Sequence, residues 1–199
     1  MIAAVVLASG FSRRLGQSKL NLEVGGRTLL ERALDTVSTA GELGRRLVVL
    51  QPESLMFLNR VRYSGIEPLA NPHAAAGQSA AIRLATAHLT DDPTVEAIIF
   101  SVVDQPFLTP AVFAALAEAW SNGGGEILVS SYEARRGNPV LFGRRYFDEL
   151  QKLSGDVGGR EILRAHPEAV HEVPMPDPAA GQDVDTWEDL QAAQAAASD

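Results

Sequence analysis

Residues 2–10 read IAAVVLASG, an apolar run that passes directly into small residues and a glycine. An apolar run without alternation is typical of a strand that is buried on both faces, as in a parallel sheet. The loop after such a strand lies at the carboxyl edge of the sheet, where α/β proteins bind ligands. This stretch therefore predicts the class of the fold and the edge at which a ligand binds.

The rest of the chain alternates short apolar runs with helical patterns. Further strands are expected at 47–50, 66–69, 97–103 and 127–129, and helices at 28–39, 77–89, 109–120 and 190–198. This order predicts an α/β fold with a mainly parallel sheet and right-handed crossovers. Because we find neither an internal repeat nor a long linker, residues 1–199 are expected to form a single domain.

Composition excludes several classes of protein. The chain has 199 residues, a formal charge of −8 and no cysteine. An acidic chain does not suit general nucleic-acid binding, and no apolar run approaches the ~18 residues of a membrane span. Without cysteine there is no disulfide framework and no thiolate metal site, and the first residues lack the basic region of a signal peptide. We therefore expect a cytoplasmic protein with neither nucleic acid nor membrane as a partner.

The loop after the first strand carries basic side chains among small residues. Residues 7–19 read LASGFSRRLGQSK. Backbone N–H groups in such a loop form a nest for anions, and Arg14 and Lys19 add charges that suit phosphate oxygens. The spacing of Gly10 and Gly16 differs from that of a dinucleotide-binding loop, and Lys19 is not placed as in a P-loop. A surface loop with solvated basic side chains remains the alternative.

The pattern Leu-Ala-x-Gly-x-Ser-x-Arg-x-Gly-x-x-Lys resembles the opening of the MobA-like nucleotidyltransferases, and in particular of the molybdenum cofactor cytidylyltransferase branch. The resemblance implies a Rossmann-like three-layer α/β/α fold of the nucleotide-diphospho-sugar transferase type. It also implies that Arg14 and Lys19 are catalytic. The nucleotide contacts that it implies in this loop are Leu7, Ala8, Ser9, Gly10, Ser12, Arg14 and Lys19.

A second segment, from Asn71 to Ser79, follows the third expected strand and opens the next helix. Asn71 offers a donor and an acceptor, Gly77 allows close approach, and Ser79 has a hydroxyl at a helix start. A turn followed by a helix cap explains the same residues equally well. By resemblance, Asn71, Gly77 and Ser79 contact the base and ribose of the nucleotide.

Two acidic residues are candidate metal ligands. Asp104 directly follows the apolar strand at 97–103, and Asp185 lies in the segment Asp183-Val184-Asp185-Thr186. Asp104 could instead be a turn and cap residue, and Asp185 or Thr186 could simply cap the last helix. By resemblance, Asp104, which is also expected to be catalytic, and Asp185 bind the metal. The expected cofactor is Mg²⁺, which prefers one or two carboxylates together with waters and substrate phosphates.

The acceptor side is expected in two later segments. By resemblance, Asn138 in the segment Arg136–Phe142 and Asp156 and Arg160 in the glycine-rich segment after Leu153 contact the acceptor. An ordinary loop with a cap is the alternative for the latter. Cytidylyl-transferring relatives tend to show Asp-Gln-Pro, and guanylyl-transferring relatives Asp-Met-Pro. Gln105 therefore favours CTP, whereas Ser9 matches the pattern of neither group.

Together these features predict an enzyme that moves NMP, preferably from CTP, to the terminal phosphate of molybdopterin cofactor and releases pyrophosphate. A downstream molybdoenzyme or its chaperone is expected as a further partner. One alternative is GTP as the donor or another phosphorylated acceptor. Another is a non-catalytic protein that binds and delivers the cofactor. A dinucleotide-dependent oxidoreductase is disfavoured by the glycine spacing of the first loop.

Overall fold

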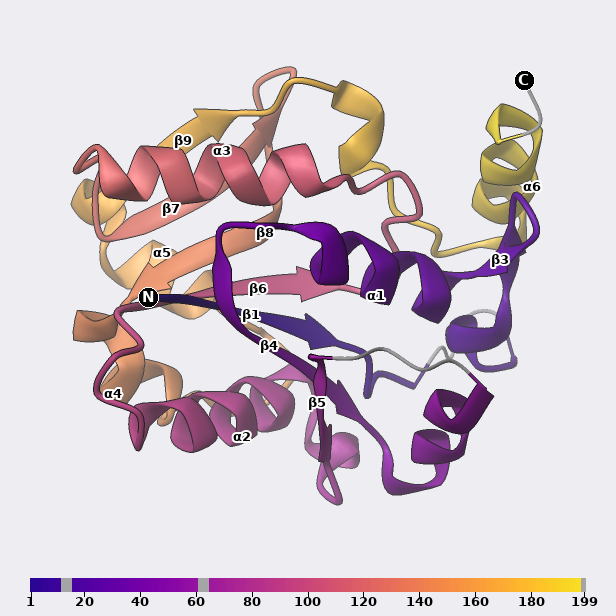
Figure 1. The fold of residues 1–199 in the computed structure, drawn as a ribbon, viewed down its shortest axis with the longest axis horizontal. Helices are drawn as coiled ribbons and strands as arrows, with labels where there is room; N and C mark the ends of the chain where they lie inside the picture. The colour runs from indigo at the N-terminus through magenta and orange to yellow at the C-terminus, as the bar shows by residue number, and fades with distance from the viewer. Residues whose placement is uncertain (12–15, 61–64, 198–199) are drawn as a thin grey trace.

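The computed structural model describes residues 1–11, 16–60 and 65–197. Its central feature is a seven-stranded sheet of the described residues, in the order β5-β4-β1-β6-β8-β7-β9 (Figure 1). The strands are β1 (Ile2–Leu7), β4 (Leu43–Leu50), β5 (Glu67–Ala70), β6 (Ala97–Val102), β7 (Ile127–Tyr132), β8 (Arg135–Gly143) and β9 (Val170–Pro174). β1 lies between β4 and β6 and is parallel to both, as the apolar run at its position predicted.

Helices cover both faces of the sheet (Figure 1). One apolar core includes residues of α1 (Leu29–Thr39), α3 (Pro110–Ser121) and α6 (Trp187–Ala196). The other includes residues of α2 (Gln78–Thr90), α4 (Phe147–Leu150) and α5 (Arg160–Ala165). Successive residues of β1 alternate between the two cores, since side chains of a strand point to opposite faces. The three-layer α/β/α fold with a mainly parallel sheet is therefore confirmed.

The strand β8 is the exception to the parallel arrangement, and the sequence did not predict it. It pairs antiparallel with β6 and β7, whereas β7 and β9 are parallel. Glu133 and Ala134 connect β7 to β8 with φ of 48° and 65°. Such a two-residue hairpin turn usually contains glycine or asparagine, so these residues gave no turn signal. β9 was missed because its residues are at most half-buried and so show no apolar run.

The ends of several elements differ from those expected. β4 begins at Leu43, four residues earlier than predicted. Its first half was missed because Gly44, Arg45 and Arg46 interrupt the apolar run by which a buried strand is recognised. α6 begins at Trp187 rather than 190, and Thr186 caps it with a side chain that accepts from the backbone of Asp189. Thr109 precedes α3 as expected, but its side chain makes no capping hydrogen bond. A small hairpin of β2 (Glu23–Val24) and β3 (Arg27–Thr28) was not predicted.

None of the helices in the described ranges has the length and the apolar character that crossing a bilayer requires.

Candidate functional site

A cavity of about 640 Å³ opens at the carboxyl edge of the sheet, beyond the ends of β1 and β6. Segments from six parts of the chain form it: the loop after β1, the helix η1 (Lys19–Asn21), the start of α2 with the residues before it, the turn after β6, the loop at 155–156 and the segment before α6. Its lining residues are Leu7, Ala8, Ser9, Gly10, Phe11, Lys19, Leu20, Ala74, Ala75, Ala76, Gly77, Gln78, Ala81, Val102, Val103, Asp104, Gly155, Asp156 and Asp185. The sequence pointed to the same edge of the sheet.

Lys19 joins the two aspartates that the sequence singled out. Its Nζ donates to Asp104 Oδ2 over 3.0 Å and to Asp185 Oδ1 over 2.5 Å. Only 12% of the Lys19 side chain is exposed. Burial by itself would lower the pKa of Lys19, but the charge of Asp104 and the hydrogen bonds to Asp185 and Asp104 outweigh it and raise the pKa. Lys19 is therefore held as a cation at the floor of the site.

The two aspartates come from segments that are tied together by the backbone. The N–H of Val184 donates to the carbonyl of Asp104 over 2.8 Å. Because both carboxylates reach one ammonium nitrogen, they can also reach one metal ion, and two carboxylates are the protein ligands that Mg²⁺ prefers. Within the described residues, no group of three or more acidic or histidine side chains forms a metal site. Water and substrate would have to supply the remaining ligands.

Asp183 adds negative charge beside this pair. Although the residue is exposed as a whole, burial of its carboxyl and the nearby charges of Asp104 and Asp185 raise its pKa to about 6. The carboxylates of Asp104, Asp183 and Asp185 lie near one another and make the site negative, and the charge of Lys19 offsets part of this. The resulting negative field attracts cations to the edge of the sheet.

Two residues expected to contact the nucleotide are buried behind the cavity wall. Asn71 is 2% exposed, and its Nδ2 donates to Ser9 Oγ over 3.1 Å, while its Oδ1 accepts from the N–H of His73. Ser79 is fully buried within α2. Neither is among the lining residues of the described chain. Asn71 instead supports the first loop through its hydrogen bond to Ser9. Gly77 occupies the N-cap position of α2.

Gly77 lies where two segments cross closely. Its φ is +89°, and a Cβ there would be 2.8 Å from the carbonyl oxygen of Gly155 and from Cα of Asp156. Asp156 Oδ1 accepts from the N–H of Gln78, the first residue of α2. The carboxylate therefore lies at the positive end of a helix and at the cavity wall. Gly77 is required by the approach of the Gly155–Asp156 loop, which the sequence did not reveal.

The other predicted acceptor contacts lie away from the cavity. Asn138 is in β8, and its carbonyl accepts from the hydroxyl of Tyr132 over 2.7 Å. Arg160 begins α5. Neither is among the lining residues of the described ranges, in contrast to Asp156. Ser12 and Arg14, which the sequence assigned to the nucleotide, lie outside the described residues.

The cavity lining of the described residues leaves out Gln105, which the sequence singled out, and includes Phe11, which it did not. Gln105 is 3% exposed and does not line the cavity, so any link between this residue and the choice of base is indirect. Phe11 does line the cavity and is 47% exposed. Sequence reasoning did not select it, although its place between Gly10 and the basic residues of the loop was a usable signal.

Comparison with known proteins identifies a family for this chain. The MobA-like NTP transferase domain matches residues 4–170. A homologue of Mycobacterium tuberculosis Rv0371c from Mycobacterium sp. strain JC1 is 29% identical, with a TM-score of 0.84 over 99% of this chain and 96% of that chain. Rv0371c itself, in a complex with manganese, is 27% identical, with a TM-score of 0.77 over 98% of each chain.

Two further similar proteins have names that denote different activities. Nicotine blue oxidoreductase of Paenarthrobacter nicotinovorans is 28% identical over 95% of this chain and 94% of its own length. Molybdopterin-guanine dinucleotide biosynthesis protein A of Archaeoglobus fulgidus is 21% identical, with a TM-score of 0.73 over 98% of each chain, and shows the shared fold. The chain therefore belongs to the MobA-like NTP transferase family, a family of nucleotidyltransferase enzymes with the nucleotide-diphospho-sugar transferase fold.

Proposed function

We propose that the protein transfers CMP from CTP to the terminal phosphate of a molybdopterin-type acceptor and releases pyrophosphate. The observation that carries this proposal is the convergence of Lys19, Asp104 and Asp185 in a cavity at the carboxyl edge of β1 and β6. Family membership supports the class of reaction, and the name of the Archaeoglobus relative supports the class of acceptor. CTP rather than GTP rests on the Asp104-Gln105-Pro106 segment.

Asp104 and Asp185 would hold Mg²⁺, since their carboxylates already meet at one cation. Manganese in the complex of Rv0371c supports a divalent ion for this fold. When bound, the ion supplies positive charge that offsets the charge on the α-phosphate and the leaving pyrophosphate. In this proposal Asp183 is not a metal ligand, and its carboxylate makes the surroundings of the metal more negative.

The remaining residues bind and orient the substrates. The backbone of the loop around Ser9 and Gly10 faces the triphosphate, Lys19 binds its oxygens, and Arg14 adds a second charge. Gly77 allows the Gly155–Asp156 loop to approach α2 at the cavity, and Asn71 acts through its hydrogen bond to Ser9. Asp156, which lines the cavity, orients the acceptor. The roles of Ser79, Asn138 and Arg160 are indirect in this proposal, because they lie outside the cavity lining.

The transfer itself needs no general base. An ionised oxygen of the acceptor phosphate forms a bond to the α-phosphorus of CTP, and the bond from that phosphorus to the bridging oxygen breaks. The electron pair leaves with pyrophosphate. Catalysis then consists of alignment and of fixed charges that stabilise the transition state.

Pyrophosphate release tests the proposal. The protein would be mixed with Mg²⁺ and with CTP, GTP, ATP or UTP, each with and without molybdopterin cofactor. We expect release with CTP that depends on the cofactor. Release with GTP would preserve the reaction class and contradict the base preference. Binding of nucleotide or cofactor without release would instead establish the delivery protein as the better description.

A second candidate function comes from the relative in Paenarthrobacter nicotinovorans, whose name denotes an oxidoreductase. The spacing of Gly10 and Gly16 does not support a dinucleotide-binding loop. Oxidation of NADH or NADPH in the presence of a nicotine blue dye, followed by absorbance, would favour this candidate.

We also propose that the protein is cytoplasmic and that a molybdoenzyme or its chaperone receives the product. Fractionation of the source cells would test the location, and co-purification would test the partner.

A further inference from the structure

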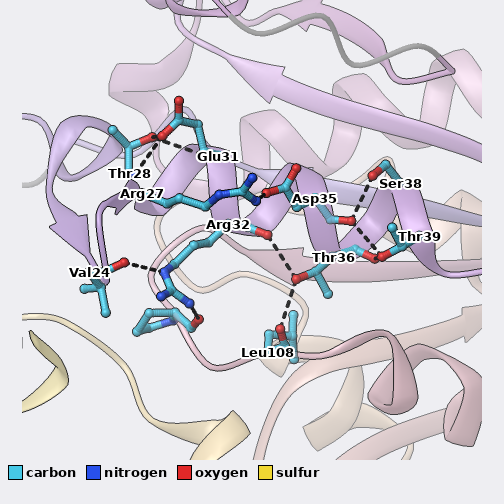
Figure 2. A network of polar contacts seen from close by, with 11 residues as sticks. Val24, Arg27, Thr28, Glu31, Arg32, Asp35, Thr36, Ser38, Thr39 and Leu108 are labelled. Carbon is cyan, nitrogen blue, oxygen red and sulfur yellow. Dashed lines mark hydrogen bonds and ion pairs between the residues drawn. The ribbon is translucent and has the colours of Figure 1, made fainter. Parts of the chain in front are cut away.

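Arg32, on α1, binds two segments of the chain that each carry a residue of the candidate site. Its Nε donates to the carbonyl of Val24 over 2.7 Å, and its Nη1 donates to the carbonyl of Pro106 over 3.1 Å. Figure 2 shows the Arg32 side chain extending from α1 toward the carbonyl of Val24. Val24 lies five residues after Lys19, and Pro106 lies two residues after Asp104.

The segment that carries Lys19 is tied to α1 by its backbone. The N–H of Leu22 donates to the carbonyl of Lys19 over 3.0 Å, and the N–H of Leu29 donates to the carbonyl of Leu22 over 2.8 Å. Between them, the β2–β3 hairpin folds onto Arg32. A Cβ at Gly25 would lie 2.6 Å from the Arg32 guanidinium, so this turn closes directly against it.

The segment that carries Asp104 is tied to the same helix. Besides the bond from Arg32 to Pro106, the Thr36 hydroxyl donates to the carbonyl of Leu108 over 3.0 Å (Figure 2). The N–H of Leu108 in turn donates to the carbonyl of Gln105. The turn after β6 therefore packs on one face of α1. It is held there by Arg32 and Thr36, which lie one helical turn apart.

We propose that Arg32 is a positioning residue, which sets the separation between the Lys19 segment and the Asp104 segment. This inference rests on the proposed function, because it takes Asp104 as a metal ligand. Arginine suits the role since its planar guanidinium presents several donors in a fixed geometry, which lysine does not. Without it, Asp104 would keep its place in the chain but lose its alignment with Lys19 and Asp185.

The chain offers a matched control for this inference. Arg46, in β4, also donates to two carbonyls, those of Val37 over 2.9 Å and Ala40 over 2.6 Å, at the other end of α1. Both arginines are half-buried. Arg32→Met and Arg46→Met therefore each remove a guanidinium that donates to two backbone carbonyls, one at each end of α1. Urea unfolding would measure how much stability each variant loses.

The informative measurement is the affinity for Mn²⁺ alone, read from the electron paramagnetic resonance signal of the unbound ion. In Arg32→Met we expect the Kd to rise about tenfold or more, in the range typical of lost support behind a metal ligand. In Arg46→Met we expect a change of less than about twofold, since a distant site acts independently. kcat should fall on the order of 10²-fold in Arg32→Met only, because small misplacements at a reacting centre are costly.

A second variant keeps the test decisive if Arg32→Met does not fold. Thr36→Val preserves volume and removes the hydrogen bond that the hydroxyl donates to Leu108, together with the local one to the carbonyl of Arg32 within α1. Because the guanidinium itself stays, the Kd for Mn²⁺ should rise by a smaller factor. Equal Kd values in wild type, Thr36→Val and Arg32→Met, or equal losses in Arg32→Met and Arg46→Met, would overturn the positioning role. Failure of the proposed function would look different, because the wild-type protein would then release no pyrophosphate from any nucleotide.

Discussion

At the scale of single residues, the sequence named the charged groups but not their partners. Lys19 meets Asp104 and Asp185 across separations of 85 and 166 residues, which no local pattern encodes. The sequence left Asp185 and Thr186 both as possible helix caps. The structure gives the cap to Thr186 with Asp189 and directs the carboxylate of Asp185 toward Lys19. Chemistry at this scale was therefore predictable as residue types, and its geometry was not.

The place of Lys19 between two carboxylates makes an unusual prediction for Lys19→Met. The ammonium and a divalent ion contend for the same oxygens, so its loss should tighten Mn²⁺ binding in the absence of nucleotide. The same change should lower kcat/KM by a factor on the order of 10²–10³, because one preorganised charge donor is lost. The two effects have opposite signs, which a merely destabilised protein would not produce.

Lys152→Met is the control for this prediction. It removes the same charge from an exposed position beyond α4, outside the cavity lining. We expect it to change neither Mn²⁺ binding nor turnover. If Lys19→Met bound Mn²⁺ more weakly than the wild type, the ammonium would not be a competitor of the metal, and its role would need another explanation.

At the scale of elements, strands with continuous apolar runs were predicted well, and the others were not. β1 and β6 are buried on both faces, and so their sequences carry a clear signal. β8 begins with the exposed Arg135 and Arg136, and β9 is at most half-buried, so neither resembles a buried strand. Both are set by pairing with neighbours in the sheet rather than by their own composition.

The crossing of α2 and the Gly155–Asp156 loop can be tested at Gly77. Gly77→Ala would place a Cβ within 2.8 Å of the loop backbone at a φ of +89°. We expect a loss of about 1–3 kcal/mol in the free energy of unfolding, together with lower activity as Asp156 is displaced. Denaturation in urea and pyrophosphate release would measure the two effects.

Gly65→Ala separates crowding from backbone strain. Gly65 has a similar φ of +86°, but among the described residues other than its chain neighbours no atom lies within 4 Å of the position of its Cβ. It should therefore cost less stability than Gly77→Ala and leave turnover unchanged. Equal costs in the two variants would mean that strain alone explains Gly77, and that the loop does not depend on this contact.

The β7–β8 hairpin has a signature in alkaline solution. Burial raises the pKa of Tyr132 from about 10 to about 12, and its hydroxyl donates to the carbonyl of Asn138. Between these values the unfolded chain ionises first, so the folded protein binds more protons and stability falls as the pH rises. In the wild type, the free energy of unfolding should fall by an amount on the order of 2 kcal/mol between pH 10 and pH 12. We expect this fall to be absent in Tyr132→Phe. Identical alkaline slopes in urea unfolding of both proteins would contradict this.

At the scale of the whole molecule, the parallel sheet assembles the site. The ends of β1 and β6 lie side by side, and they bring the first loop and the turn at Asp104 together. α2 and the later loops close the remaining walls, so that no single segment contains the site. The sequence located this edge because ligand binding at carboxyl ends follows from the topology. It could not show which side chains of the later loops face the cavity.

The most direct test of the central claim follows the fate of individual phosphates of CTP. CTP labelled at the α-phosphate or at the γ-phosphate would be incubated with the protein, Mg²⁺ and molybdopterin cofactor, and the products separated. We expect the α label on the cofactor and the γ label in pyrophosphate, with neither transfer in Asp104→Asn. The γ label on the cofactor, or both labels unchanged while NADH or NADPH is oxidised, would contradict nucleotidyl transfer by this protein.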